Sequence, residues 1–115
     1  MKRYLNKLKE GFRFSFEGSK EVIKEYAFQL ELICGIPAII FALASWVSPL
    51  EKAVLIFSIF LVFLIEVLNT AIEKTVDRIS TAHHPLSKKV KDIASFAVLL
   101  SVLNALIVWG IIYLS

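Results

Sequence analysis

Three long apolar stretches constrain the fold of this chain more than any other feature of its sequence. Residues 32–50 and 93–115 contain no charged residue, and residues 53–72 contain only Glu66. Each stretch reaches the roughly 20 residues that a helix needs to cross the hydrocarbon core of a bilayer. Hydrophobic residues make up 57% of the chain, which is more than soluble globular domains usually contain. The sequence therefore predicts an all-α integral membrane protein with three transmembrane helices.

The segment before the first apolar stretch predicts a helix of a different kind. Its large apolar side chains fall on one helical face, and most of its Lys and Arg residues fall elsewhere, which is the pattern of a helix lying in the membrane interface. The apolar face consists of Leu5, Leu8, Phe12 and Phe16.

We expect one domain over residues 1–115. It comprises an amphipathic interfacial segment at 1–30 and transmembrane helices at 31–50, 51–81 and 87–115. A break or bend is expected near Gly18, because glycine weakens helices. Pro49 is expected to mark a boundary, and Ser87 is expected to be the N-cap of the third transmembrane helix.

The basic residues are unevenly distributed along the chain. Seven of the 13 Lys and Arg residues precede the first apolar stretch, and five surround the end of the second. Basic residues are retained on the cytoplasmic side of a membrane. We therefore expect a multi-pass protein of the bacterial inner membrane with a cytoplasmic N-terminus and a periplasmic C-terminus. The net charge of +3 reflects this topology and attraction to anionic lipid, and we expect no nucleic-acid partner.

A polar stripe interrupts the second apolar stretch. At about 100° per residue, Glu66, Glu73 and Asp77 project within roughly 40° of one another, and Asn69 and Thr70 flank them. An ionisable side chain near the middle of a bilayer costs about 3 kcal/mol or more, so it persists where it pairs, binds an ion or faces water. The stripe is therefore a candidate functional site.

The chemistry available to this site is limited to carboxylates, amides, hydroxyls and lysines. The sequence contains no Walker loop, no HExxH motif and no pair of cysteines, which argues against a standard phosphate cradle and against zinc chemistry. Carboxylates suit Mg²⁺, which binds one or two of them and fills its octahedron with water and phosphate oxygens. Ser87, Lys91 and Ser95 recur every four residues and form a second polar stripe. This inventory favours phosphoryl transfer.

The segments EVLNTAIEKTVDRIS and HHPLSKKVKDIASFAV resemble the signature of the prokaryotic diacylglycerol kinase family, to which undecaprenol kinases also belong. The resemblance covers almost the whole chain. It implies a small homotrimeric lipid kinase that uses ATP and Mg²⁺, phosphorylates diacylglycerol or undecaprenol, and serves phospholipid metabolism. The sites are expected to be shared between subunits.

The resemblance also implies roles for individual residues. Glu66 is expected to be the catalytic base and to contact the lipid, together with Ser95. Glu25 and Glu73 are expected to bind the metal. Further polar positions of the site correspond to Asn69 and Asp77. Contacts with ATP are expected from Lys7, Phe14, Glu25, Glu73, His84, Lys91 and Asp92.

Other interpretations remain open from the sequence. A lone membrane glutamate such as Glu66 is also typical of small proton-coupled transporters. Glu25 and Glu31 can be read as charges that merely flank the first span, and Asp77 as a solvated residue at a helix end. Within the kinase family, diacylglycerol is preferred as the substrate, and undecaprenol is the alternative.

Overall fold

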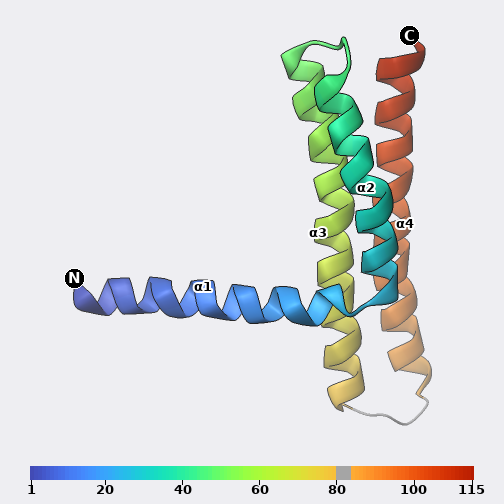
Figure 1. Ribbon diagram of the computed structural model, residues 1–115. Coiled ribbons are helices and arrows are strands. Elements are labelled where there is room, and N and C mark those ends of the chain that lie inside the picture. The colour runs from blue at the N-terminus through green and yellow to red at the C-terminus, as the bar shows by residue number, and fades with distance from the viewer. Residues whose placement is uncertain (80–83) are drawn as a thin grey trace.

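The structure is a computed structural model that describes residues 1–79 and 84–115, and in this part of the chain every secondary-structure element is an α-helix. Four helices follow one another along the chain (Figure 1). They are α1 (Lys2–Ile23), α2 (Tyr26–Ala44), α3 (Pro49–Ile79) and α4 (Pro85–Leu114). The all-α fold predicted from the sequence is confirmed.

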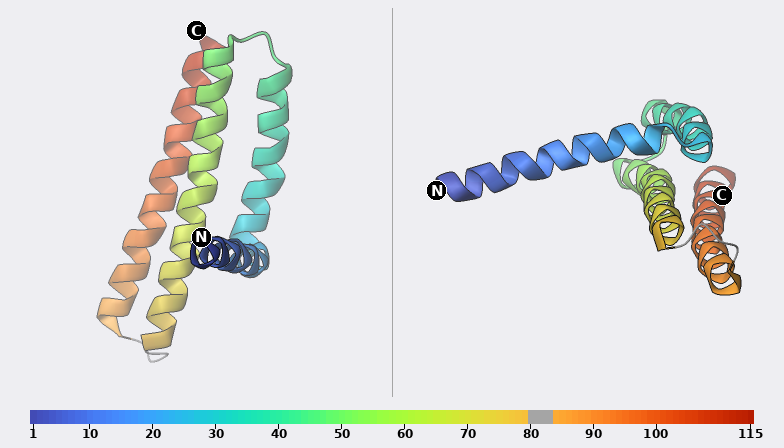
Figure 2. Two further views of the ribbon diagram at one scale, coloured as in Figure 1. Left: turned by 90° about the vertical axis from the view of Figure 1, so that its left-hand side faces the viewer. Right: turned by 90° about the horizontal axis from the view of Figure 1, so that it is seen from below.

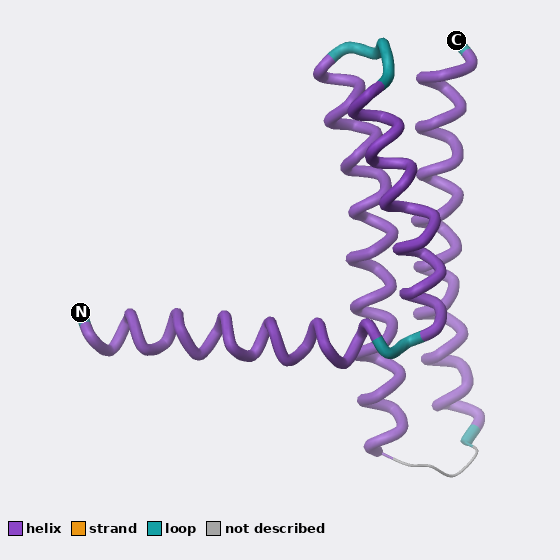
Figure 3. The backbone as a smooth tube through the Cα atoms, in the orientation of Figure 1, coloured by secondary structure: helices purple, strands orange, loops and turns teal. Residues whose placement is uncertain are grey.

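Helices α2, α3 and α4 form an elongated bundle, and α1 extends sideways from it (Figures 1 and 2). Helix α3 packs against both α2 and α4, so it is the central element of the bundle. The described loops are short and lie at the ends of helices (Figure 3). Helices α2, α3 and α4 are each long and apolar enough to cross a membrane. The chain is therefore a membrane protein with three candidate spans, as predicted.

The turn between α2 and α3 is fixed by a reciprocal cap. The backbone N–H of Glu51 donates to Ser48 Oγ at 3.2 Å, and the backbone N–H of Ser48 donates to Glu51 Oε1 at 3.0 Å. This capping box satisfies two backbone donors at the start of a helix. Pro49 occupies the first helical position, where its missing N–H costs nothing. The predicted boundary at Pro49 is confirmed.

Helices α2 and α3 approach each other closely at Gly35. A Cβ atom at this position would lie 2.5 Å from Cζ of Phe63 and 3.0 Å from Cγ2 of Ile59. Small residues allow helix backbones to come together in membranes, where packing rather than water exclusion drives association. Gly35 therefore sets the distance between α2 and α3 just above the polar stripe.

The end of the bundle near the 45–48 turn is held by packing and by two polar bonds. Ala42, Val47 and Leu55 are buried there against aromatic and aliphatic side chains of α4. Trp109 Nε1 donates to Ser58 Oγ at 3.0 Å, which links α4 to α3. A further bond of 2.8 Å joins the hydroxyls of Ser45 and Tyr113. These contacts hold α2, α3 and α4 together at this end of the bundle.

Two predicted helix boundaries are wrong. Helix α1 continues through Gly18, and the chain turns instead at residues 24 and 25. Helix α4 begins at Pro85 rather than at Ser87, and its N-cap is His84, whose Nδ1 accepts a hydrogen bond from the backbone N–H of Leu86 at 3.0 Å. Besides these two boundaries, the helix of the first predicted span differs from 31–50, because α2 begins at Tyr26 and ends at Ala44. The predicted end of the second span at residue 81 lies outside the described residues.

Candidate functional site

The polar stripe on α3 forms a hydrogen-bonded cluster. Asn69 Nδ2 donates to Glu66 Oε2 and to Glu73 Oε1, and each distance is 3.1 Å. Glu66 is only 4% exposed and Asn69 only 9%, whereas Glu73 is half-buried. One amide group therefore holds two carboxylates that stand two helical turns apart, at the positions that helical spacing predicts. We call Glu66, Asn69 and Glu73 the carboxylate cluster.

The carboxylate cluster keeps one buried acceptor without a partner among the described residues. Asn69 Oδ1 is inaccessible to solvent, and no donor lies within hydrogen-bonding distance of it there. A buried polar atom left unpaired costs about 1–3 kcal/mol. Neighbouring Thr70 does not relieve this cost, because its hydroxyl donates to the backbone carbonyl of Glu66 at 3.0 Å. The cluster therefore lowers the stability of the isolated bundle, which favours a functional role over a structural one.

Sequence reasoning missed one member of this region, Glu31 on α2. Its Oε2 atom is buried and has no hydrogen-bond partner among the described residues, and its side chain lines a pocket between α2, α3 and α4. Glu31 was one of two possible charges flanking a span, and the sequence offered no sign of contact with α3. The only available signal was its position at the start of an otherwise uncharged apolar stretch.

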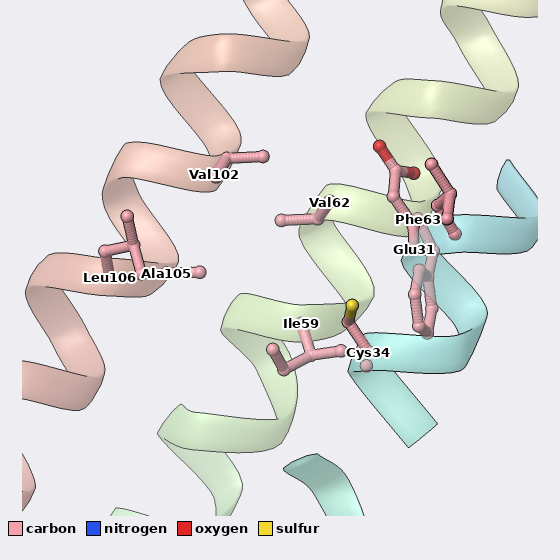
Figure 4. A pocket seen from close by; sticks show the side chains of 10 residues that line it. Glu31, Cys34, Ile59, Val62, Phe63, Val102, Ala105 and Leu106 are labelled. Atoms are coloured by element: carbon pink, nitrogen blue, oxygen red, sulfur yellow. The ribbon is translucent and has the colours of Figure 1, made fainter. Parts of the chain in front are cut away.

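An apolar pocket of about 310 Å³ opens beside Glu31. Figure 4 shows Glu31 and Cys34 from α2, Val62 and Phe63 from α3, and Val102 of α4 around it. Its lining is apolar except for Glu31. The pocket therefore places the Glu31 side chain at a hydrophobic space between all three candidate spans.

A set of ion pairs lies where α3 and α4 approach the 80–83 connection, and we call this the charged end of the bundle. Lys91 Nζ on α4 lies 2.6 Å from Asp77 Oδ1 on α3. Within α4, Lys88 Nζ lies 2.7 Å from Asp92 Oδ2. The structure thus brings Lys91 and Asp77 together, although the sequence assigned them only to the same general site.

Glu25 is the N-cap residue of α2, and it also reaches α3. Its Oε1 atom lies 3.6 Å from Nζ of Lys74, the residue that follows Glu73. The described residues contain no group of three or more His, Cys, Asp or Glu side chains arranged to hold a metal. Mg²⁺ does not need such a group, because one or two carboxylates and phosphate oxygens suffice. Glu25 and Glu73 are both carboxylates, which suits this chemistry, and metal binding by this pair stays a prediction.

Among the described residues, the hydrogen bonds of the carboxylate cluster include none of the other predicted site residues, and four of these residues also form no ion pair beside it. Lys7 and Phe14 have exposed side chains on α1, which extends away from the bundle (Figure 2). Ser95 is exposed on α4, and His84 is engaged as the cap of that helix. The contribution of these four residues to ligand binding stays a prediction.

Comparisons with known proteins extend the resemblance seen in the sequence. The sequence model described as "Prokaryotic diacylglycerol kinase" matches residues 13–113. A protein of Escherichia coli (strain K12) named diacylglycerol kinase is 38% identical over 100 residues, which are 86% of this chain and 82% of that protein. A diacylglycerol kinase of Pseudomonas aeruginosa is 36% identical over 104 residues, covering 90% of this chain and 80% of the relative. One from Helicobacter pylori (strain 26695) is 40% identical over 90 residues, covering 76% and 69%.

Proposed function

This chain belongs to the prokaryotic diacylglycerol kinase family and is a lipid kinase, and we propose that it phosphorylates diacylglycerol to phosphatidic acid with ATP. The observation that carries this proposal is the hydrogen-bonded cluster in which Asn69 joins Glu66 and Glu73. The reaction takes place at the cytoplasmic face of a bacterial inner membrane, with the N-terminus in the cytoplasm and the C-terminus in the periplasm. The positive-inside distribution of Lys and Arg supports this orientation.

Glu66 is the proposed catalytic base. A bond forms between the hydroxyl oxygen of the lipid and the γ-phosphorus, the bond between that phosphorus and the β,γ-bridging oxygen breaks, and ADP leaves. The hydroxyl proton passes to the Glu66 carboxylate. The burial of Glu66 supports this role, because a carboxylate near the apolar layer can meet the headgroup of a membrane alcohol. Asn69 fixes the orientation of that carboxylate through the 3.1 Å bond, and orientation is a large part of catalysis in such reactions.

Glu73 and Glu25 are the proposed metal ligands. Mg²⁺ held by these two carboxylates would neutralise the negative charge of the phosphates. Glu73 is held by Asn69 on the side of the cluster nearer the charged end. Lys91, Asp92 and His84 lie at that end and are the proposed contacts of the nucleotide. The family resemblance supports these assignments.

The apolar part of the lipid has a candidate location beside the acidic side chains. The pocket next to Glu31 is apolar and is lined by α2, α3 and α4. An alcohol whose hydroxyl reaches Glu66 can place hydrophobic surface there without meeting water. Ser95 is the proposed second contact of the lipid. Its support is the family resemblance and its place on the polar stripe of α4.

We propose that the active kinase is a homotrimer. Within one chain, Lys7 and Phe14 lie on a helix that points away from the carboxylate cluster. A site that uses them therefore needs α1 from a neighbouring copy, which agrees with the shared sites implied by the resemblance. The apolar residues Leu5, Leu8 and Phe12 of α1 are exposed, as expected for a helix at the membrane interface.

The experiment is transfer of labelled γ-phosphate from MgATP by the purified chain in mixed micelles. Diacylglycerol and undecaprenol are offered separately, and the lipid products are resolved by chromatography. Phosphatidic acid as the dominant product supports the proposal. Undecaprenyl phosphate would assign the alternative substrate of the same family. If a folded sample phosphorylates neither lipid, the proposed reaction is contradicted. The alternative function of a proton-coupled transporter, against which family membership argues, would then be favoured.

A further inference from the structure

Two residues that the proposed mechanism does not use are paired with residues that it does. Lys74 lies 3.6 Å from Glu25, a proposed metal ligand. Asp77 lies 2.6 Å from Lys91, a proposed phosphate contact. Lys74 directly follows Glu73 on α3, and Asp77 lies three residues after Lys74. A cation of α3 therefore lies against a proposed metal ligand, and an anion of α3 against a proposed phosphate contact.

We propose that Lys74 and Asp77 are resident counter-ions of the nucleotide site. Lys74 neutralises Glu25 until a divalent cation takes its place, and Asp77 neutralises Lys91 until a polyphosphate takes its place. This inference rests on the proposed function, because it requires that Glu25 meets the metal and Lys91 meets phosphate. In addition, Lys74 competes with the metal ion for Glu25, and Asp77 competes with the phosphates of the nucleotide for Lys91.

The arrangement of the pairs supports exchange rather than a purely structural role. Each pair joins α3 to a different segment: Glu25 precedes α2, and Lys91 belongs to α4. The side chains are 56% and 41% exposed in the first pair and 40% and 58% exposed in the second. Ligands from solvent can therefore reach both pairs. By contrast, Lys88 and Asp92 pair within a single helix turn and link no separate segments.

The exposure also sets the size of the expected effect. Ion pairs exposed to this degree contribute little and are screened by salt. Removing a resident counter-ion should therefore strengthen ligand binding only about two- to fivefold at low salt. The direction of the change is the informative part, because loss of a residue that contacts the ligand directly would weaken binding instead.

The first test measures Mn²⁺ binding, by electron paramagnetic resonance of the free ion, to the full-length chain in detergent micelles. Lys74→Met is expected to tighten Mn²⁺ binding about two- to fivefold. In the Glu25→Gln background the same substitution is expected to have no effect, because its partner is absent. Lys20→Met is the matched control, since it removes one positive charge from an exposed pair within α1.

The second test measures binding of labelled ATP by equilibrium dialysis in the presence of EDTA. Asp77→Asn is expected to tighten ATP binding about two- to fivefold, and to leave it unchanged when Lys91→Met is already present. This double-mutant comparison separates an effect of Asp77 that acts through Lys91 from a general change in the electrostatic potential of the site. Glu17→Gln, in the same α1 pair as Lys20, is the matched control.

The outcomes distinguish this inference from the proposed function. Weaker Mn²⁺ binding by Glu25→Gln supports the assignment of Glu25 as a metal ligand. If Lys74→Met then has no effect on Mn²⁺ affinity, or raises it equally in the wild type and in Glu25→Gln, the role of Lys74 as a counter-ion is refuted. Weaker ATP binding in Asp77→Asn would refute the role of Asp77 in the same way. If Glu25→Gln leaves Mn²⁺ affinity unchanged, or if neither wild type nor Lys74→Met binds Mn²⁺, the metal assignment fails and the inference fails with it.

Discussion

Replacing Asn69 with leucine should reduce catalysis without removing either carboxylate. Leucine has nearly the same shape as asparagine but cannot donate to Glu66 and Glu73, each of which lies 3.1 Å from Nδ2. Hydrogen bonds to charged groups contribute about 1.5–3 kcal/mol each. Loss of the bond to Glu66 releases the proposed base from its orientation, and a misplacement of about 1 Å in a catalytic group can cost about a hundredfold in rate. We expect kcat to fall by about a hundredfold.

The assay is steady-state phosphorylation of diacylglycerol at saturating MgATP, with kcat and KM determined separately. A positioning role predicts a loss concentrated in kcat, with KM for the lipid changed much less. The matched control is Thr70→Val, because Thr70 is buried beside Asn69 but donates only to a backbone carbonyl. We expect that variant to keep wild-type kcat within about threefold. The positioning role of Asn69 would be refuted by a folded Asn69→Leu enzyme with near-normal kcat. It would also be refuted by a loss of kcat in Thr70→Val as large as that in Asn69→Leu.

Three further substitutions test the support of the site, each by thermal unfolding in micelles. Gly35→Ala should destabilise the chain by about 1–3 kcal/mol, because its Cβ would lie 2.5 Å from Phe63; an unchanged Tm would mean that α2 and α3 are not in close contact. Ser48→Ala should cost about 1 kcal/mol through loss of the cap shared with Glu51, and a neutral result would argue against that cap. Trp109→Phe removes the 3.0 Å bond to the serine hydroxyl of α3 and should cost about 1 kcal/mol; a stabilised variant would contradict this bond.

The helices were predictable because apolar length and helical spacing are strong signals. The predicted break at Gly18 failed, because an isolated glycine costs a helix only about 1 kcal/mol relative to alanine and a Cβ there would meet nothing within 4 Å. The actual turn after α1 has no side-chain cap at Glu25, so no sequence motif marked it. The start of α4 was predictable in principle, since Pro85 at the first helical turn is a recognised signal.

The carboxylate cluster was predictable to the level of the helix face. Spacing placed Glu66, Asn69 and Glu73 on one side of α3, but it could not show that a single amide bridges both acids. The role of Glu31 was unpredictable for a different reason. Its position in the pocket lining depends on the packing of α2 against α3, and that packing depends on close approach at Gly35 rather than on local periodicity.

The most direct test of the account compares Glu66→Gln with Glu51→Gln in phosphoryl transfer from MgATP to diacylglycerol. Both changes replace a glutamate of α3 by its neutral isostere, but Glu51 lies in the cap at the opposite end of that helix. We expect Glu66→Gln to lower kcat by at least about a hundredfold, as expected for loss of a general base, and Glu51→Gln to phosphorylate lipid at nearly the wild-type rate. Rapid phosphorylation of diacylglycerol by a folded Glu66→Gln enzyme would contradict the assignment of Glu66 as the catalytic base.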